Sequence, residues 1–138
     1  MHRTGGNVRR TLRTLLATAA LATAAIGVTV APAHADWVGI TLYEDSGYQG
    51  YPHAYTTSRL GLYGWWENDV ASSVKNSDVF AWVLYDDRDY KDRHFCVRPG
   101  EWVENLGSSP WKFNDKVSSL KRLTTSSCAG YIPFYNLA

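Results

Sequence analysis

Two short segments of the chain carry clusters of oxygen-bearing side chains with the same spacing. Both follow the pattern Asn-Asp-x-x-Ser-Ser, at residues 68–73 and again at residues 114–119. Carboxylates, amides, hydroxyls and backbone carbonyls are the ligands that a hard cation such as calcium takes, usually about six to eight oxygens at a time. The same residue types also hydrogen-bond their own backbone in turns. The pattern therefore indicates either a pair of calcium sites or a pair of ordinary turns.

Other residues that could do chemistry form no comparable pattern. His53 and His94 are the only histidines after residue 35, and neither has a second ligand at a spacing that suits zinc. Spacing singles out no pair of carboxylates for glycosidase chemistry, and the chain has no G-x-S-x-G nucleophile elbow. We therefore expect a protein that is not an enzyme.

The first 35 residues are typical of an export signal. Four arginines and no acid precede residue 14, residues 15–30 are apolar or small, and Ala33-His34-Ala35 is a small-x-small cleavage site. Cleavage after Ala35 would leave a secreted, extracellular chain with no membrane span. The general secretory and twin-arginine routes both stay open.

Removal of these 35 residues changes the charge of the chain. The whole chain has 14 basic and 13 acidic residues, and the loss of Arg3, Arg9, Arg10 and Arg13 leaves a net charge of −3. A mildly acidic domain lacks the electrostatic footprint for phosphate backbones, so we expect no nucleic-acid partner. The 6 Trp, 9 Tyr and 4 Phe all follow residue 35. This aromatic content is enough to build a core in a small domain.

An internal repeat sets the expected fold. Residues 43–50 realign with 85–92, and residues 68–75 realign with 114–121 with five of eight positions identical. Alternating apolar residues in both copies predict strands, and no segment keeps a convincing helical period beyond a short turn near residues 102–106. We predict an all-β sandwich of two Greek key motifs, with copy one at residues 37–76 and copy two at residues 79–123.

Cys96 and Cys128 are the only cysteines. An even count in a small exported chain usually means a disulfide, so we predict that they pair. The bond would tie a tail at residues 126–138 to a domain at residues 36–125 and would stabilise it by about 3 to 4 kcal/mol. No cysteine is left over for a covalent dimer, and we expect a monomer.

Tyr43, Tyr48 and Gly50, followed by Asn-Asp-x-x-Ser-Ser at residues 68–73, form a pattern that resembles the βγ-crystallin Greek key motif. The resemblance covers residues 37–123 and implies a βγ-crystallin-like sandwich. Copy two departs from the family at Asp92, where the family has glycine in the hairpin between the first two strands. Aspartate tolerates a left-handed backbone better than most residues, so we expect this hairpin to form at some cost.

The resemblance also implies calcium as a cofactor. In the proteins that this chain resembles, two calcium ions lie between the copies, each held by an acidic loop of one copy and a serine hydroxyl of the other. The implied side-chain ligands are the carboxylates of Asp69 and Asp115 and the hydroxyls of Ser72 and Ser118. The implied backbone ligands are the carbonyls of Val70, Lys116, Glu44 and Asp86. Asn68 and Asn114 either bind the ion or brace the loops. Few carboxylates per site, with Lys116 in copy two, predict an affinity on the order of micromolar to millimolar.

These features predict a secreted, calcium-stabilised binding module with an extracellular partner. One alternative is a peptidase inhibitor, because the chain is similar to small exported actinobacterial proteins that include the Streptomyces-type metallopeptidase inhibitors, which typically carry more cysteines. Further alternatives are a killer-toxin-like protein and a protein that binds cell-wall glycans. A glycan-binding surface would use Tyr51, Tyr55, Tyr63, Trp65 and Trp66. We expect these five aromatic residues to pack in the core instead.

Overall fold

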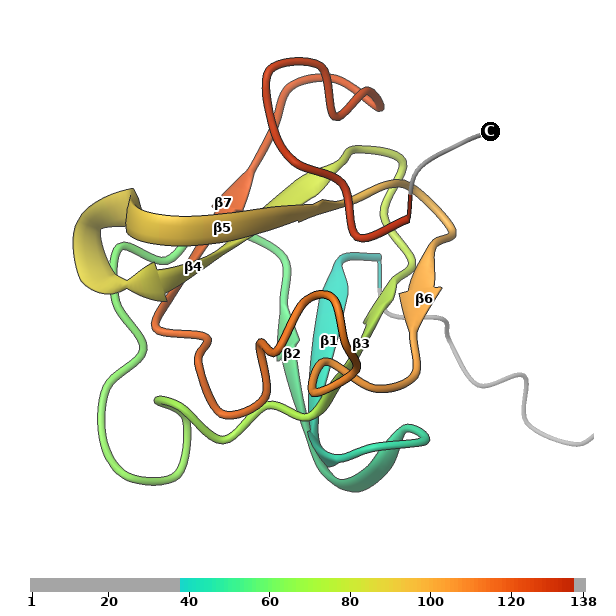
Figure 1. Ribbon diagram of the computed structural model, residues 1–138. Coiled ribbons are helices and arrows are strands. Elements are labelled where there is room, and N and C mark those ends of the chain that lie inside the picture. The colour runs from blue at the N-terminus through green and yellow to red at the C-terminus, as the bar shows by residue number, and fades with distance from the viewer. Residues whose placement is uncertain (1–37, 136–138) are drawn as a thin grey trace, which may run out of the picture. The chain divides into compact units, whose positions relative to one another are not determined.

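The protein, seen here in a computed structural model that describes residues 38–135, is built from antiparallel strands (Figure 1). The expected export signal and its cleavage site lie outside the described residues. No helix among residues 38–135 is long and apolar enough to cross a membrane. The elements in chain order are β1 (Ile40–Asp45), β2 (Gln49–Tyr55), β3 (Ser73–Asn76), β4 (Trp82–Asp87), η1 (Arg88–Tyr90), β5 (Lys91–Val97), β6 (Trp102–Val103) and β7 (Ser119–Arg122).

The strands form two sheets that exchange segments. One sheet has the order β2-β1-β3-β6 and the other β5-β4-β7. Strand β6 belongs to copy two, yet it pairs with β3 of copy one through Val74 and Val103. In return, Arg59 of copy one forms a bridge with Leu120 of β7. This exchange makes two interlocked Greek keys, which confirms the all-β class and the predicted sandwich.

The core draws apolar side chains from both sheets. Ile40 and Leu42 of β1 lie in the same buried cluster as Trp82 and Leu84 of β4. Successive residues of a strand point to opposite faces, so the intervening Val83 enters a second cluster on the outer side of β4. Each fully buried aliphatic side chain contributes about 1.5 to 3 kcal/mol. Strand β4 is therefore covered on both faces, as its unbroken apolar sequence predicts.

The C-terminal tail packs against β5 of copy two, with Cys128 in the outer cluster and Phe134 in the central core. Cys96 in β5 is joined to Cys128 by a disulfide, with 5.8 Å between their Cα atoms. Beyond the bond, the Cys96 amide donates to the Ile132 carbonyl at 2.7 Å, and the Phe134 ring stacks on Phe95 at 4.9 Å between centroids. The tail therefore packs back on the domain by a covalent bond, hydrogen bonds and aromatic contacts together.

The hairpins of the two copies follow the same path. Gly50 has a φ of 74°, and Asp92 at the matching place has a φ of 63°. The hairpin that departs from the family pattern therefore forms, with aspartate in the left-handed region. The expectation of a short helical turn near residues 102–106 was wrong. Trp102 and Val103 pair with β3, while the only short helix of the described chain is η1, in the hairpin of copy two.

The expectation that five aromatic residues lie in the core was also wrong for four of them. Tyr55 is 5% exposed, whereas the other four are largely exposed, namely Tyr51 (66%), Tyr63 (62%), Trp65 (85%) and Trp66 (53%). Strand β2 is at the edge of its sheet, and most of its residues are exposed. The connection that follows it runs along the outside. Aromatic content alone does not distinguish such a surface from a core.

Candidate functional site

The two Asn-Asp loops cross at the interface between the copies. The Asp69 amide of copy one donates to the Val117 carbonyl of copy two at 3.1 Å. The Asp115 amide of copy two donates to the Ala71 carbonyl of copy one at 3.0 Å. Both aspartates have a left-handed backbone, with φ of 56° and 52°. Each loop is thus fixed by the other copy, in a nearly symmetrical arrangement.

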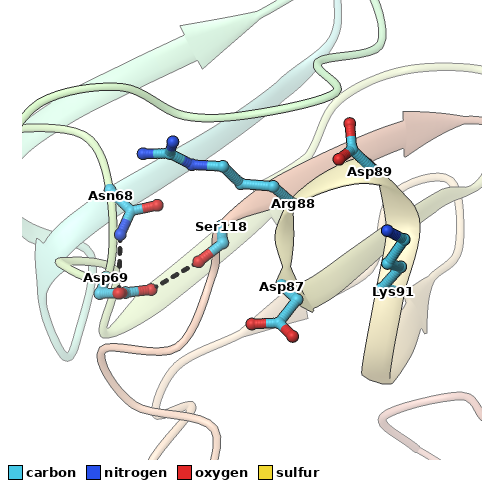
Figure 2. A pocket seen from close by; sticks show the side chains of 7 residues that line it. All are labelled: Asn68, Asp69, Asp87, Arg88, Asp89, Lys91 and Ser118. Atoms are coloured by element: carbon cyan, nitrogen blue, oxygen red, sulfur yellow. Dashed lines mark hydrogen bonds between the residues drawn. The ribbon is translucent and has the colours of Figure 1, made fainter.

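The first site joins Asp69 of copy one to Ser118 of copy two. The Ser118 hydroxyl donates to Asp69 Oδ1 at 2.8 Å, and Asn68 Nδ2 donates to Asp69 Oδ2 at 2.7 Å. Figure 2 shows these two hydrogen bonds converging on the carboxylate. The structure thus brings together an acid of one copy and a serine of the other, which is the crossed arrangement that the family resemblance implies.

Asn68 offers a further oxygen at this site. Its Oδ1 atom is buried and accepts no hydrogen bond from the described residues. Burying a carbonyl oxygen without a partner costs about 1 to 3 kcal/mol. Because the neighbouring oxygens belong to a carboxylate and a hydroxyl, the set fits a hard cation that takes oxygen ligands. The residues present are therefore compatible with calcium.

The second site has the same residues with one contact fewer. Asn114 Nδ2 donates to Asp115 Oδ2 at 2.8 Å, as in the first loop. Ser72 is buried like Ser118. Within residues 38–135, however, no hydrogen bond joins the Ser72 hydroxyl to Asp115. The second loop therefore has the same bracing by asparagine but lacks the hydrogen bond between the aspartate carboxylate and the serine hydroxyl of the other copy.

The predicted carbonyl ligands lie at irregular points of the strands. Pairing shifts register around Glu44 in β1 and around Asp86 in β4. The Ser72 amide donates to the Tyr43 carbonyl and the Ser118 amide to the Tyr85 carbonyl, both at 2.8 Å. Glu44 therefore belongs beside Ser72, and Asp86 beside Ser118.

The side chains of the same two residues have other partners. The Glu44 carboxylate contacts His53 at 3.2 Å, and the Asp86 carboxylate accepts from Arg93 at 3.1 Å. These contacts engage the side chains, so only the backbone carbonyls of Glu44 and Asp86 remain for the ligand role that the resemblance implies. Val70 and Lys116, the other predicted carbonyl donors, follow the aspartates in the crossing loops.

An open pocket of about 460 Å³ surrounds the first site. Besides residues of the Asn-Asp motif, it is lined by Asp87, Arg88, Asp89 and Lys91 of the copy-two hairpin. Figure 2 shows Arg88 extended across the pocket above Ser118. The sequence pattern did not single out these residues. The signal was in the 42-residue offset, which aligns this turn with the turn between β1 and β2.

Carboxylates are sparse in both sites. Residues 38–135 contain no group of three or more His, Cys, Asp or Glu side chains that could hold a metal ion together. A cation at Asp69 or Asp115 would therefore depend on one carboxylate, on neutral oxygens of the chain and on water. Such a ligand set gives weak binding in comparison with sites that contain three or four carboxylates.

Comparison with known proteins identifies the fold. The family described as Beta/Gamma crystallin matches residues 39–123. The structure resembles a beta gamma crystallin from Ciona intestinalis, with 29% identity and a TM-score of 0.53 over 61% of this chain and 98% of that one.

Two further solved structures share the fold. One, solved in work on the evolution of the eye lens beta-gamma-crystallin domain fold, has 24% identity and a TM-score of 0.55 over 62% of this chain and 84% of that one. A betagamma-crystallin from an archaeon has 22% identity and a TM-score of 0.51 over 61% and 95%. Among curated proteins, none matches the chain. The family match, which spans most of the described residues, and the interlocked Greek keys together show that the chain belongs to the beta/gamma crystallin family.

Proposed function

We propose that the protein is a secreted, non-enzymatic beta/gamma crystallin module that binds two calcium ions where its loops cross. The observation that carries the proposal is the meeting of Asp69 with Ser118, next to the unpartnered oxygen of Asn68. The disulfide between Cys96 and Cys128 supports an extracellular location, since such bonds persist in oxidising compartments.

Calcium would act by cross-linking the two copies. A bound cation supplies positive charge to a carboxylate of one copy and an oxygen of the other. The chain holds these groups in place in advance, because the amides of Asp69 and Asp115 are already bonded across the interface. A ligand that binds only the folded state stabilises it by mass action, by about 2.7 kcal/mol at a concentration one hundred times its dissociation constant.

The charges around the two sites determine the calcium affinity that we expect. Each site has one carboxylate from its loop, and the pocket at Asp69 also contains Arg88 and Lys91, whose positive charge offsets the negative charge of Asp87 and Asp89. Like charge near a cation site lowers affinity. We propose an affinity on the order of micromolar to millimolar, the range that suits an extracellular module.

Thermal unfolding tests this function. Protein treated with chelator is titrated with calcium, with magnesium as the ionic control, and the melting temperature is recorded. We expect a rise that saturates with calcium and is much smaller with magnesium. Ser118→Ala removes the hydroxyl that joins the two copies at the first site, so its titration should require a higher calcium concentration. Ser127→Ala, in the exposed tail, is the matched control and should titrate as the wild type. No shift up to millimolar calcium would contradict the proposal.

A further inference from the structure

A second surface, lined by residues that precede the first crossing loop, has the features of a binding site. Strand β2 and the connection after it expose the rings of Tyr51, Tyr63 and Trp66. Trp65, the most exposed of the large apolar residues, meets Trp66 edge to face at 5.7 Å between centroids. Clustered exposed aromatic residues mark sites of interaction more often than isolated ones.

Two adjoining pockets lie among these rings. One, of about 340 Å³, is lined by Tyr51, Tyr55, Trp66 and neighbours, and the other, of about 320 Å³, by Leu60, Tyr63 and neighbours. Both pockets include Arg59 and Glu67, so these two residues stand at the boundary between them. The arrangement gives two adjacent compartments, each with aromatic walls, around a shared pair of opposite charges.

Backbone hydrogen bonds fix this surface to the other sheet. The Arg59 amide donates to the Leu120 carbonyl at 2.7 Å, and the Leu120 amide donates back to the Arg59 carbonyl at 2.9 Å. These bonds attach the segment after β2 to β7 of the other sheet. The Arg88 guanidinium lies 4.7 Å from the centre of the Tyr63 ring and supports it from the second copy. The pockets are therefore largely formed before any ligand arrives.

Tyr55 supplies an observation that points to a ligand. The residue is 5% exposed and lines the first pocket, and its hydroxyl has no hydrogen-bond partner in the described chain. Burial, with the nearby charge of Glu67, raises the pKa of Tyr55 well above its ordinary value. The hydroxyl therefore keeps its proton at every physiological pH. A buried donor without an acceptor is costly, and a ligand hydroxyl would satisfy it.

We propose that the two pockets form one binding site for a β-1,4-linked pyranose oligosaccharide. Equatorial linkages make such a chain a flat ribbon, with apolar C–H faces that pack on aromatic rings such as Trp66. Its hydroxyls project at the edges, where Glu67 accepts and Arg59 and Tyr55 donate. Because the polar pair carries one charge of each sign, the site matches a neutral sugar better than a phosphate or a polycation.

The geometry favours a sugar over a lipid surface. Membrane-binding segments present apolar side chains outward, whereas here a carboxylate and a guanidinium lie at the centre of the concave surface. Burying both charges in acyl chains would be unfavourable. The site uses none of the proposed calcium ligands, because Asp69 and Asp115 line neither pocket, although Arg88 borders both surfaces. It stands whether or not calcium binds.

Calorimetric titration with chitotetraose and with cellotetraose tests the site, with calcium present throughout. We expect saturable binding of at least one tetrasaccharide, and at least a tenfold loss of affinity in Trp66→Ala. Trp102→Ala is the matched control, because Trp102 is exposed to a similar extent but lines neither pocket. Its affinity should equal that of the wild type.

Tyr55→Phe separates binding from folding. Because the hydroxyl has no partner in the free protein, its removal should leave the melting temperature unchanged or raise it, while sugar affinity falls severalfold. A fall in melting temperature would show that the hydroxyl is already bonded within the protein and would overturn this part of the argument. No heat with either tetrasaccharide up to millimolar concentration would overturn the proposal. So would binding to phosphatidylcholine vesicles, lost in Trp65→Ala, without sugar binding.

Discussion

The two crossing loops have the same motif but different surroundings. At the first loop, Asp69 accepts a hydrogen bond from Ser118 of the other copy, and Arg88 and Lys91 line the pocket. At the second loop, the positions that match these two cations are Ser46 and Gln49, by the 42-residue offset of the repeat. The positive charge there is instead in the loop itself, at Lys116.

This difference shows that a repeated motif does not make two equal sites. Because the loops cross, each site takes its surroundings from the hairpin of the other copy. Divergence between the hairpins therefore changes the site of the opposite loop. The charged groups lie at the surface, where solvent and salt weaken their effect, so we expect the two affinities to differ by severalfold rather than by orders of magnitude.

The largest expected asymmetry concerns the outer face of the two copies. Cys96 of copy two carries the disulfide, whereas the matching residue of copy one is Ala54. Replacing both cysteines by alanine should lower the free energy of unfolding by about 3 to 4 kcal/mol, because the bond closes a loop of 32 residues. Urea unfolding measures the change. A loss below about 1 kcal/mol would mean that the packing of Phe134 holds the tail without the bond.

The hairpins differ in the residue at their left-handed position. A Cβ at Gly50 would lie 2.9 Å from Asp45 Oδ2 and 3.1 Å from the Asp45 amide nitrogen. Gly50→Ala should therefore cost about 2 kcal/mol, the sum of backbone strain and crowding. Asp92→Gly, the reverse change in copy two, should stabilise by up to about 1 kcal/mol. Thermal unfolding compares the two variants, and equal effects of the same sign would contradict the account.

Removing one carboxylate at a time separates the two calcium sites. Asparagine tolerates the left-handed backbone of both loops, so Asp69→Asn and Asp115→Asn change charge with little effect on conformation. Each should weaken one site at least tenfold, about 1.4 kcal/mol, and leave the other unchanged. Calcium titration followed by NMR amide shifts distinguishes the loops. Loss of both sites in either variant would show that they bind as one unit.

The smallest expected effects come from exchanging residues between the copies. Lys116→Val and Arg88→Ser each place the residue of copy one in copy two. Both remove positive charge near a cation site, so calcium affinity should rise about two- to fivefold at the nearer loop, and less at high salt. Lys121→Gln, at a lysine in β7 that contacts Tyr131, is a control of equal charge change. Equal gains in calcium affinity in all three variants would indicate that the net charge of the protein, and not the position of the charge, sets the affinity.

The repeat carried most of the information that the sequence holds about the fold. Five identities between residues 68–75 and 114–121 predicted two copies of one loop, and in both loops the asparagine donates to the aspartate that follows it. The exchange of β6 could not be predicted, because two residues are too short for a strand pattern. Trp102 and Val103 become a strand only through pairing with β3.

Two features of the surface were equally hidden from the sequence. Whether Tyr51 is core or surface depends on β2 being an edge strand, which is a property of sheet order. Arg88 and Asp69 line the same pocket only because the two copies cross, since Arg88 belongs to copy two and Asp69 to copy one. Residue types and spacing predict the structure of each copy. The contacts between the copies depend on how the two copies pack together in three dimensions.

Isothermal titration with calcium tests the central claim most directly, because it counts the ions. The account predicts two ions for each wild-type chain, with micromolar to millimolar affinity, and one ion at the same concentrations for Asp69→Asn. Magnesium should give little heat under the same conditions. Absence of calcium binding in the wild type, or unchanged stoichiometry in both Asp69→Asn and Asp115→Asn, would contradict the assignment of the crossing loops as calcium sites.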